Sequence, residues 1–288
     1  MTVARTADLM ALASSNGSAV FAFNVITLEH AEAVVTGAER SGTGVIVQVS
    51  ENTVRFHGGQ LSPLVCAVAH LAKDSSVPVA IHLDHIKDVD LIVSAIDAAG
   101  TLEISSIMVD AAHLAFEANV HRTREAVRGA HSVGLYVEAE LGEVGGKPDA
   151  HAVGARTDPT QASTFVTRTG VDALAVAVGS EHAMTTRDAQ IDLGLVEELR
   201  VSVPVPLVLH GGSGVSDDLV AHAVGAGIRK VNVGTALNVV YTGAIREVLA
   251  SQPSVTDPRK YLGAARDSTA DRVARMCAGL RKATGVLS

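Results

Sequence analysis

Short apolar runs alternate with longer Ala-rich segments along most of the chain. The apolar runs are rich in β-branched residues and are bounded by turn residues, as buried strands are. A polar residue ends each run or follows it closely. The runs cover residues 19–24, 45–50, 79–84, 106–110, 135–141, 173–179, 206–211 and 230–234.

The segments between these runs have the apolar spacing of helices, and several end in glycine, which commonly stops a helix. Examples are residues 27–42, 90–100, 160–170 and 217–227. Strands and helices alternating in this way predict the α/β class and a (β/α)8 TIM barrel. A doubly wound sheet is the rival, but its first strand is followed by a glycine-rich turn, and "FNVITLEH" has no glycine. We therefore expect one barrel domain over 1–288, with a C-terminal helical extension over about 255–288.

Composition favours an enzyme that acts on a small molecule. The 288 residues are 47% hydrophobic and 19% charged, the net charge is −8, and 3% of residues are aromatic. An acidic chain with few aromatic residues is a poor candidate for nucleic-acid binding. It also lacks the roughly 18 continuous apolar residues of a membrane span, and we identify no signal peptide. Cys66 and Cys277 have no metal-ligand spacing, so we expect reduced thiols in a cytoplasmic protein.

Polar residues lie where the predicted strands end. In barrels of this kind, the carboxyl ends of the strands carry the chemistry. We therefore expect these side chains, with the cluster "HLDH" among them, to line the mouth of the barrel. They are Asn24, Ser50, Asp84, His85, Asp110, Glu138, Glu140, His182, His210 and Asn232.

Three of these residues, His85, His182 and His210, belong to three different strand ends. Three neutral imidazoles with one open position form a catalytic Zn²⁺ site. Asp84, beside His85, is the candidate to move a proton during the reaction, with orientation of His85 as its alternative role. His82 is assigned to packing or to support of the site.

Two glycine-rich turns follow the last two predicted strands, in "HGGSGVSDD" and "NVGTAL". Backbone N–H groups at these positions of a barrel commonly bind phosphate. The alternative is a pair of tight turns with capping hydroxyls.

The chain resembles the zinc-dependent, class II ketose-bisphosphate aldolases, which include fructose-bisphosphate and tagatose-bisphosphate aldolases. The resemblance runs through "FAFNV", "IHLDH", "SIMVDAAHLAFEANV", "VEAELGEVGG", "TGVDALAVAVGSEHAM", "LVLHGGSGVS", "KVNVGTAL" and "DPRKYL". It implies a barrel fold, a homodimer or homotetramer, a sugar-phosphate substrate, one Zn²⁺ per subunit and a monovalent cation near the phosphate. It does not distinguish the fructose from the tagatose substrate.

Carried over by position, the resemblance makes His85, His182 and His210 the zinc ligands and Asp84 the acid/base on the C4 hydroxyl. Glu140 would offer an alternative metal position, and Asp110 and Glu138 would support the site. The substrate and phosphate residues would be Asn24, Ser50, Ala183, Gly211, Gly212, Ser213, Asn232, Val233, Gly234, Thr235 and, from a neighbouring subunit, Arg259.

The chain departs from the family pattern at three places. Ala183 stands where the family mostly has glycine, and Ala112 replaces a usual serine. Pro148 occupies the place of the glutamate that moves a proton at C3 of dihydroxyacetone phosphate. We expect residues 145–157 to form a mobile lid in which Asp149 takes over that role, with a solvated connector as the alternative.

These departures leave other hypotheses open. The substrate could be a modified ketose phosphate, or the chain could be a zinc-binding relative without aldolase activity. A Schiff-base aldolase is disfavoured, because none of the six lysines lies at the end of the sixth predicted strand. Lys230 begins the last predicted strand, at the wrong rim of the barrel.

Overall fold

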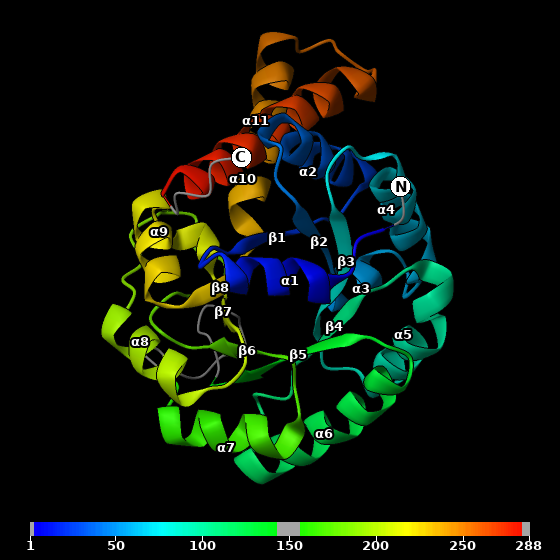
Figure 1. Ribbon diagram of the computed structural model, residues 1–288. Helices are drawn as coiled ribbons and strands as arrows, with labels where there is room; N and C mark the ends of the chain where they lie inside the picture. Colours follow the sequence, from blue (N-terminus) through cyan, green and yellow to red (C-terminus); the bar gives the residue numbers. More distant parts are fainter. Residues whose placement is uncertain (1–2, 143–155, 284–288) are drawn as a thin grey trace.

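The computed structural model describes residues 3–142 and 156–283, and within them eight parallel strands close into a barrel (Figure 1). Each strand pairs with the next along the chain, and β8 pairs with β1. The strands are β1 (Val20–Asn24), β2 (Val45–Ser50), β3 (Val79–Ile86), β4 (Ser106–Val109), β5 (Tyr136–Leu141), β6 (Ala173–Val176), β7 (Leu207–Leu209) and β8 (Ile228–Val233). The predicted (β/α)8 barrel is confirmed.

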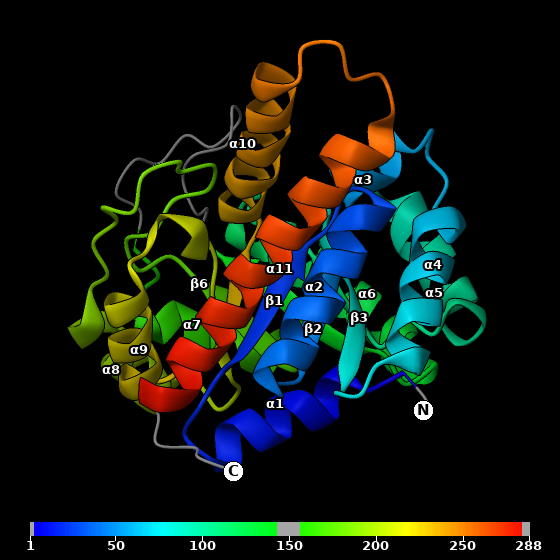
Figure 2. The ribbon, with the colours of Figure 1, turned by 90° about the horizontal axis from the view of Figure 1, so that it is seen from above.

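Helices follow the strands and surround the barrel, and further helices lie at its two ends (Figures 1 and 2). The helices are α1 (Thr6–Ser15), α2 (Leu28–Ser41), α3 (Glu51–Phe56), α4 (Ser62–Asp74), α5 (Val89–Leu102), α6 (Phe116–Ser132), α7 (Pro159–Thr169), α8 (Leu193–Ser202), α9 (Asp217–Ala226), α10 (Thr235–Ser251) and α11 (Pro258–Ala283). Helix α11 packs against α2 and α10. None of the described helices is long and apolar enough to cross a membrane.

Side chains along each strand point alternately to the outside of the barrel, where the helices pack, and to its interior. Ile81 and Leu83 of β3 belong to the large apolar core shared with the surrounding helices. Their neighbours Ala80 and His82 have the opposite orientation, into the barrel. Near the amino ends of the strands this interior is apolar, and Leu9 and Met10 of α1 pack against it.

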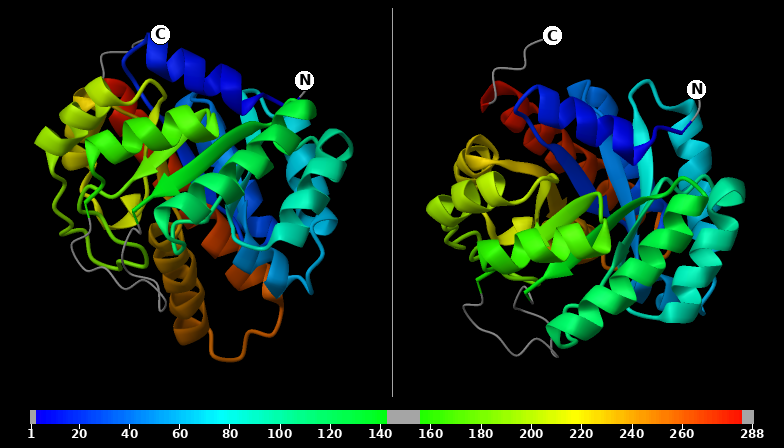
Figure 3. Two further views of the ribbon diagram at one scale, coloured as in Figure 1. Left: turned by 90° about the horizontal axis from the view of Figure 1, so that it is seen from below. Right: turned by 60° about the horizontal axis from the view of Figure 1, so that its bottom comes forward.

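Helix α1 therefore closes one end of the barrel, and α10 projects beyond the other end (Figure 3). The interior turns polar towards the second end, where Gln48, Glu138 and His210 are buried. The fold thus leaves the carboxyl ends of the strands as the end that can hold a polar site.

One placement differs from the prediction. Strand β8 begins at Ile228, before Lys230, so Lys230 is buried inside the barrel and not at its amino-terminal rim. Its Nζ lies 2.6 Å from Glu138 Oε2. The reason is pairing of Ile228 with Leu207 of β7, which extends β8 at its start. The lysine is held in an ion pair, which still disfavours its use as a Schiff base.

Candidate active site

A cavity of about 700 Å³ opens at the carboxyl ends of the strands. The segments after β1, β3, β4, β6, β7 and β8 contribute to its wall, together with α3 after β2 and the end of β5. Of the predicted site residues, those lining it are Asn24, Ser50, Asp84, His85, Asp110, Glu140, His182, Ala183, Gly211, Ser213, Asn232, Gly234 and Thr235.

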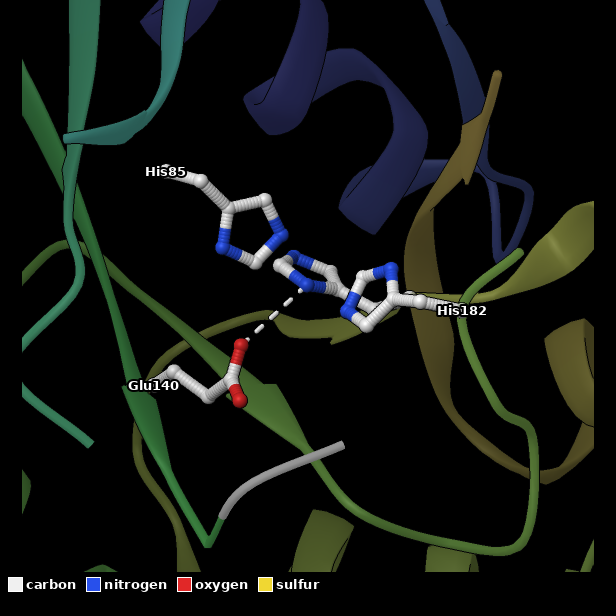
Figure 4. A group of neighbouring side chains, drawn as sticks. His85, Glu140 and His182 are labelled. Atoms are coloured by element: carbon white, nitrogen blue, oxygen red, sulfur yellow. Dashed lines mark ion pairs between the residues drawn. The ribbon is translucent and has the colours of Figure 1, made fainter. Parts of the chain in front are cut away.

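Four side chains converge at the base of this cavity, where His85, Glu140 and His182 line it and His210 is buried beside them. We call these four residues the histidine–glutamate group. One ligand atom from each lies within 4.8 Å of the others. Figure 4 shows His85, His182 and Glu140 pointing toward one another from separate parts of the barrel. The predicted meeting of three histidines from distant strand ends is therefore present in the structure.

Carboxylates fix two of these imidazoles. Nδ1 of His85 donates to Asp110 Oδ2 at 2.9 Å, and Nε2 of His210 donates to Glu138 Oε1 at 2.9 Å. Each bond leaves the other ring nitrogen directed at the group. Nε2 of His85 is buried without a hydrogen-bond partner among the described residues, and Nδ1 of His210 lies 3.3 Å from Glu140 Oε2.

This arrangement fits a divalent metal such as zinc. Nitrogen ligands with one carboxylate are donors that zinc uses, and the outer carboxylates orient the imidazoles as they do around metal ions in proteins. Burial lowers the pKa of His210, but hydrogen bonds to Glu138 and Glu140 outweigh it and raise this pKa to about 9. The negative surroundings that hold this proton would equally stabilise a metal cation.

Asp84 stands beside the histidine–glutamate group but is not part of it. Its Oδ2 accepts from Asn24 Nδ2 at 2.7 Å, and Asn24 Oδ1 accepts from Gln48 Nε2 at 3.2 Å. Its Oδ1 is buried without a hydrogen-bond partner among the described residues. Burial raises the pKa of Asp84, but electrostatic interactions with His85, His210 and Lys230 lower it below its ordinary value, so the carboxylate is charged and able to accept a proton.

One contact bears on the two roles considered for Asp84. Asp110, and not Asp84, accepts the hydrogen bond of His85 Nδ1. His82 lies deeper, where its Nδ1 is 2.7 Å from Ser106 Oγ. It is a buried packing residue.

The two glycine-rich turns meet at the start of α10. Ser213 Oγ accepts from the backbone N–H groups of Gly234, at 3.2 Å, and Ala236, at 3.0 Å. Gly211 has φ 67°, and a Cβ added there would lie 2.5 Å from the carbonyl oxygen of Glu181. Only glycine allows this approach, which brings the loop of β7 against the loop that carries His182.

Some predicted residues lie elsewhere. Gly212 and Val233 are buried behind the cavity wall, and Val233 packs in the apolar core. Arg259, on α11, is 88% exposed and pairs with Asp257 at 2.7 Å, away from the cavity of its own chain. Asp149, Pro148 and most of the predicted lid lie outside the described residues.

The cavity also has residues that the sequence analysis did not identify, notably Glu51, Arg55, Lys87 and Asn238. Glu51 and Arg55 form an i,i+4 ion pair on α3. That spacing is visible in "SENTVRF", but the helix is only six residues long and follows a strand directly, so the pattern is easily missed.

Comparison with known proteins agrees with this geometry. Residues 4–284 match the family model for class II fructose-bisphosphate aldolase. The chain is 41% identical over 255 residues to fructose-bisphosphate aldolase of Geobacillus stearothermophilus, covering 87% of each chain. It is 38% identical over 270 residues to the enzyme of that name from Staphylococcus aureus, covering 92% of this chain and 93% of the other.

Among solved structures, the chain is similar to the YdjI aldolase of Escherichia coli K12. The TM-score is 0.82 at 32% identity, with 99% of this chain and 98% of that chain covered. The motifs, the barrel and the match over nearly the whole chain agree, and the chain belongs to the class II fructose-bisphosphate aldolase family, whose activity is that of a lyase.

Proposed function

We propose that this protein is a metal-dependent aldolase that reversibly cleaves a ketose 1,6-bisphosphate of the fructose or tagatose type. The products would be dihydroxyacetone phosphate and an aldehyde phosphate. One observation carries the proposal: the histidine–glutamate group and the charged Asp84 lie side by side at the base of one cavity. The names of its relatives agree with this reaction.

His85, His182 and His210 would hold Zn²⁺, with Glu140 as an alternative ligand. Bound zinc would supply a Lewis acid that polarises the ketone of the substrate. Asp110 and Glu138 orient the imidazoles and keep the donating nitrogens directed at the site.

Asp84 would accept the proton of the C4 hydroxyl. The C3–C4 bond then breaks, C4 becomes the aldehyde carbon, and the electron pair stays with the three-carbon fragment. Asn24 holds one oxygen of Asp84, which leaves Oδ1 for the hydroxyl. General acid–base catalysis of this kind contributes about 10²–10⁴-fold to a rate.

The three-carbon fragment must next take up a proton at C3. We assign this step to Asp149, which lies outside the described residues, so the role stays a prediction. Exchange of the C3 proton of dihydroxyacetone phosphate with deuterated solvent tests it. Asp149→Ala should slow the exchange, and an unchanged rate would remove Asp149 from the mechanism.

The phosphate of the same fragment would bind where the two glycine-rich turns meet. Gly234, which precedes α10, has no side chain to cap this helix of 17 residues, and Ser213 Oγ accepts from the backbone N–H groups of Gly234 and Ala236. Phosphate favours such a terminus, because the N–H groups and the helix dipole both attract negative charge. A monovalent cation near this phosphate stays a prediction.

We also propose that the protein works as a homodimer or homotetramer. Arg259 does not line the cavity of its own chain, and it is highly exposed at the start of α11. From there it would serve a neighbouring subunit, where it would bind the far phosphate.

We propose a cytoplasmic location for the protein. The free thiols Cys66 and Cys277 fit a cytoplasmic protein.

A substrate panel tests the proposed function. Cleavage of fructose 1,6-bisphosphate, tagatose 1,6-bisphosphate and fructose 1-phosphate would be followed by the release of dihydroxyacetone phosphate from zinc-loaded protein. We expect one of the two bisphosphates to be the best substrate. Zinc-loaded protein that cleaves none of them, and does not exchange the C3 proton, would favour a relative without aldolase activity.

A further inference from the structure

One end of the cavity carries positively charged side chains that have no part in the proposed proton transfers. Arg55, on α3, and Lys87, in the loop after β3, both line this end, which we call the basic end. Neither belongs to the histidine–glutamate group.

The basic end lies across the mouth of the barrel from the predicted phosphate clamp. In a closed barrel with strand order β1 to β8, β3 and β7 are on opposite sides. Lys87 follows β3, whereas Gly211 and Ser213 follow β7. A substrate whose phosphate lies against α10 would therefore extend over the metal ligands toward Lys87 and Arg55.

A buried carboxylate builds this end of the cavity. Glu51 Oε2 accepts from the backbone N–H groups of Lys87, at 2.7 Å, and Asp88, at 2.9 Å. Its Oε1 pairs with the guanidinium of Arg55. Glu51 thus joins α3 to the loop after β3 and fixes the two cationic residues on one wall. Burial of this charge is tolerable because these partners compensate it.

Both cations keep donors for a ligand. The side chain of Arg55 is 66% exposed, and a guanidinium has five N–H donors in a planar fork that suits phosphate or carboxylate. Lys87 is 40% exposed, and its Nζ is 4.0 Å from Asp110 Oδ2, which is beyond hydrogen-bond distance. Two such donors on one wall favour an anion.

We propose that Arg55 and Lys87 bind the anionic group at the end of the substrate remote from the dihydroxyacetone phosphate unit. This inference rests on the proposed function and narrows the class of aldehyde that the enzyme would release. The aldehyde product would carry a terminal phosphate or carboxylate, and binding of that anion would be provided within one chain. Arg259 of a neighbouring subunit would add to this charge.

The condensation direction tests the subsite with three aldehydes. Zinc-loaded protein receives dihydroxyacetone phosphate with glyceraldehyde 3-phosphate, with neutral glyceraldehyde, or with tartronate semialdehyde, which ends in a carboxylate. Arg55→Met and Lys87→Met should each raise KM for the preferred anionic aldehyde by about tenfold or more, as expected for a lost charge-assisted hydrogen bond. The kcat/KM for glyceraldehyde should not change.

Two further variants separate binding from folding. Arg55→Lys keeps the charge and should recover part of the lost affinity. Arg168→Met removes an arginine that is likewise paired with a carboxylate, Glu117 at 2.7 Å, but lies on α7 outside the cavity, and it should change nothing.

Each outcome decides the question. A raised KM for the phosphate aldehyde, for the carboxylate aldehyde or for both, with the neutral aldehyde unaffected, supports the subsite and identifies its anion. An equal loss of kcat/KM for the neutral aldehyde, or an unchanged KM for the anionic aldehydes in both variants, overturns the proposed subsite. Solvent exchange of the C3 proton needs no aldehyde, so wild-type protein that exchanges while the variants lose no affinity disproves the subsite alone. Wild-type protein without exchange or condensation overturns the proposed function and the subsite with it.

Discussion

Lys230 Nζ lies 2.6 Å from Glu138 Oε2 inside the barrel, and both side chains are 1% exposed. The other oxygen of Glu138 accepts from His210 Nε2 at 2.9 Å. Burial raises the pKa of Glu138, but Lys230 and His210 lower it strongly, so the carboxylate stays charged. The buried ion pair between Lys230 and Glu138 therefore holds the carboxylate that orients His210, one of the predicted metal ligands.

Lys230→Met should destabilise the protein, because it leaves the charge of Glu138 buried without its main partner. The expected loss is about 3–5 kcal/mol in the free energy of unfolding, the usual cost of breaking such a pair. Urea unfolding measures it. Lys73→Met, which breaks a partly exposed pair with Glu103, is the control and should cost about 1 kcal/mol or less. Equal losses in the two variants would contradict a structural role for the buried pair.

The eight strands could be predicted because their apolar runs have a clear period and each has a polar end. The three histidines could be assigned to one site because a barrel brings strand ends together. The position of Lys230 could not, since it depends on β8 beginning at Ile228, where pairing extends the strand beyond the sequence pattern. The basic end was also missed, because Glu51 reaches Lys87 through a contact between segments that are not adjacent in sequence.

Asp84→Ala should lower turnover by about 10²–10⁴-fold while metal and phosphate binding persist, because it removes a general base and not a ligand. Metal content after dialysis and the steady-state rate on the best bisphosphate are the two measurements. A variant that loses zinc, yet turns over normally when zinc is in excess, would assign Asp84 to orientation of the site.

Gly211→Ala should impair both folding and phosphate binding, because its Cβ would lie 2.5 Å from the Glu181 carbonyl oxygen in addition to the positive φ. Gly17→Ala is the matched control, with φ 61° and nothing within 4 Å of the added Cβ. The control should cost about 1–2 kcal/mol for the backbone alone. The crowding at Gly211 should add about 1–3 kcal/mol. Unfolding curves that coincide for the two variants would mean that the approach to Glu181 does not matter.

The two thiols should differ in reactivity. Cys66 is exposed, whereas Cys277 is buried, and burial raises the pKa of Cys277 to about 12. Since the thiolate is the reactive form, iodoacetamide at pH 8 should modify only Cys66 in the folded protein and both residues in denaturant. Peptide mass mapping identifies the site. Rapid labelling of Cys277 under native conditions would show that the packing of α11 opens readily.

The central claim is that cleavage requires a metal held by the histidine–glutamate group. The most direct measurement is the cleavage rate on the preferred bisphosphate after exhaustive chelation, with metal content determined on the same sample, and again after zinc is added. The rate should fall to background and return as about one zinc binds per chain, and His210→Ala should neither bind zinc tightly nor recover. Full activity in protein whose metal has been shown to be absent would contradict the account.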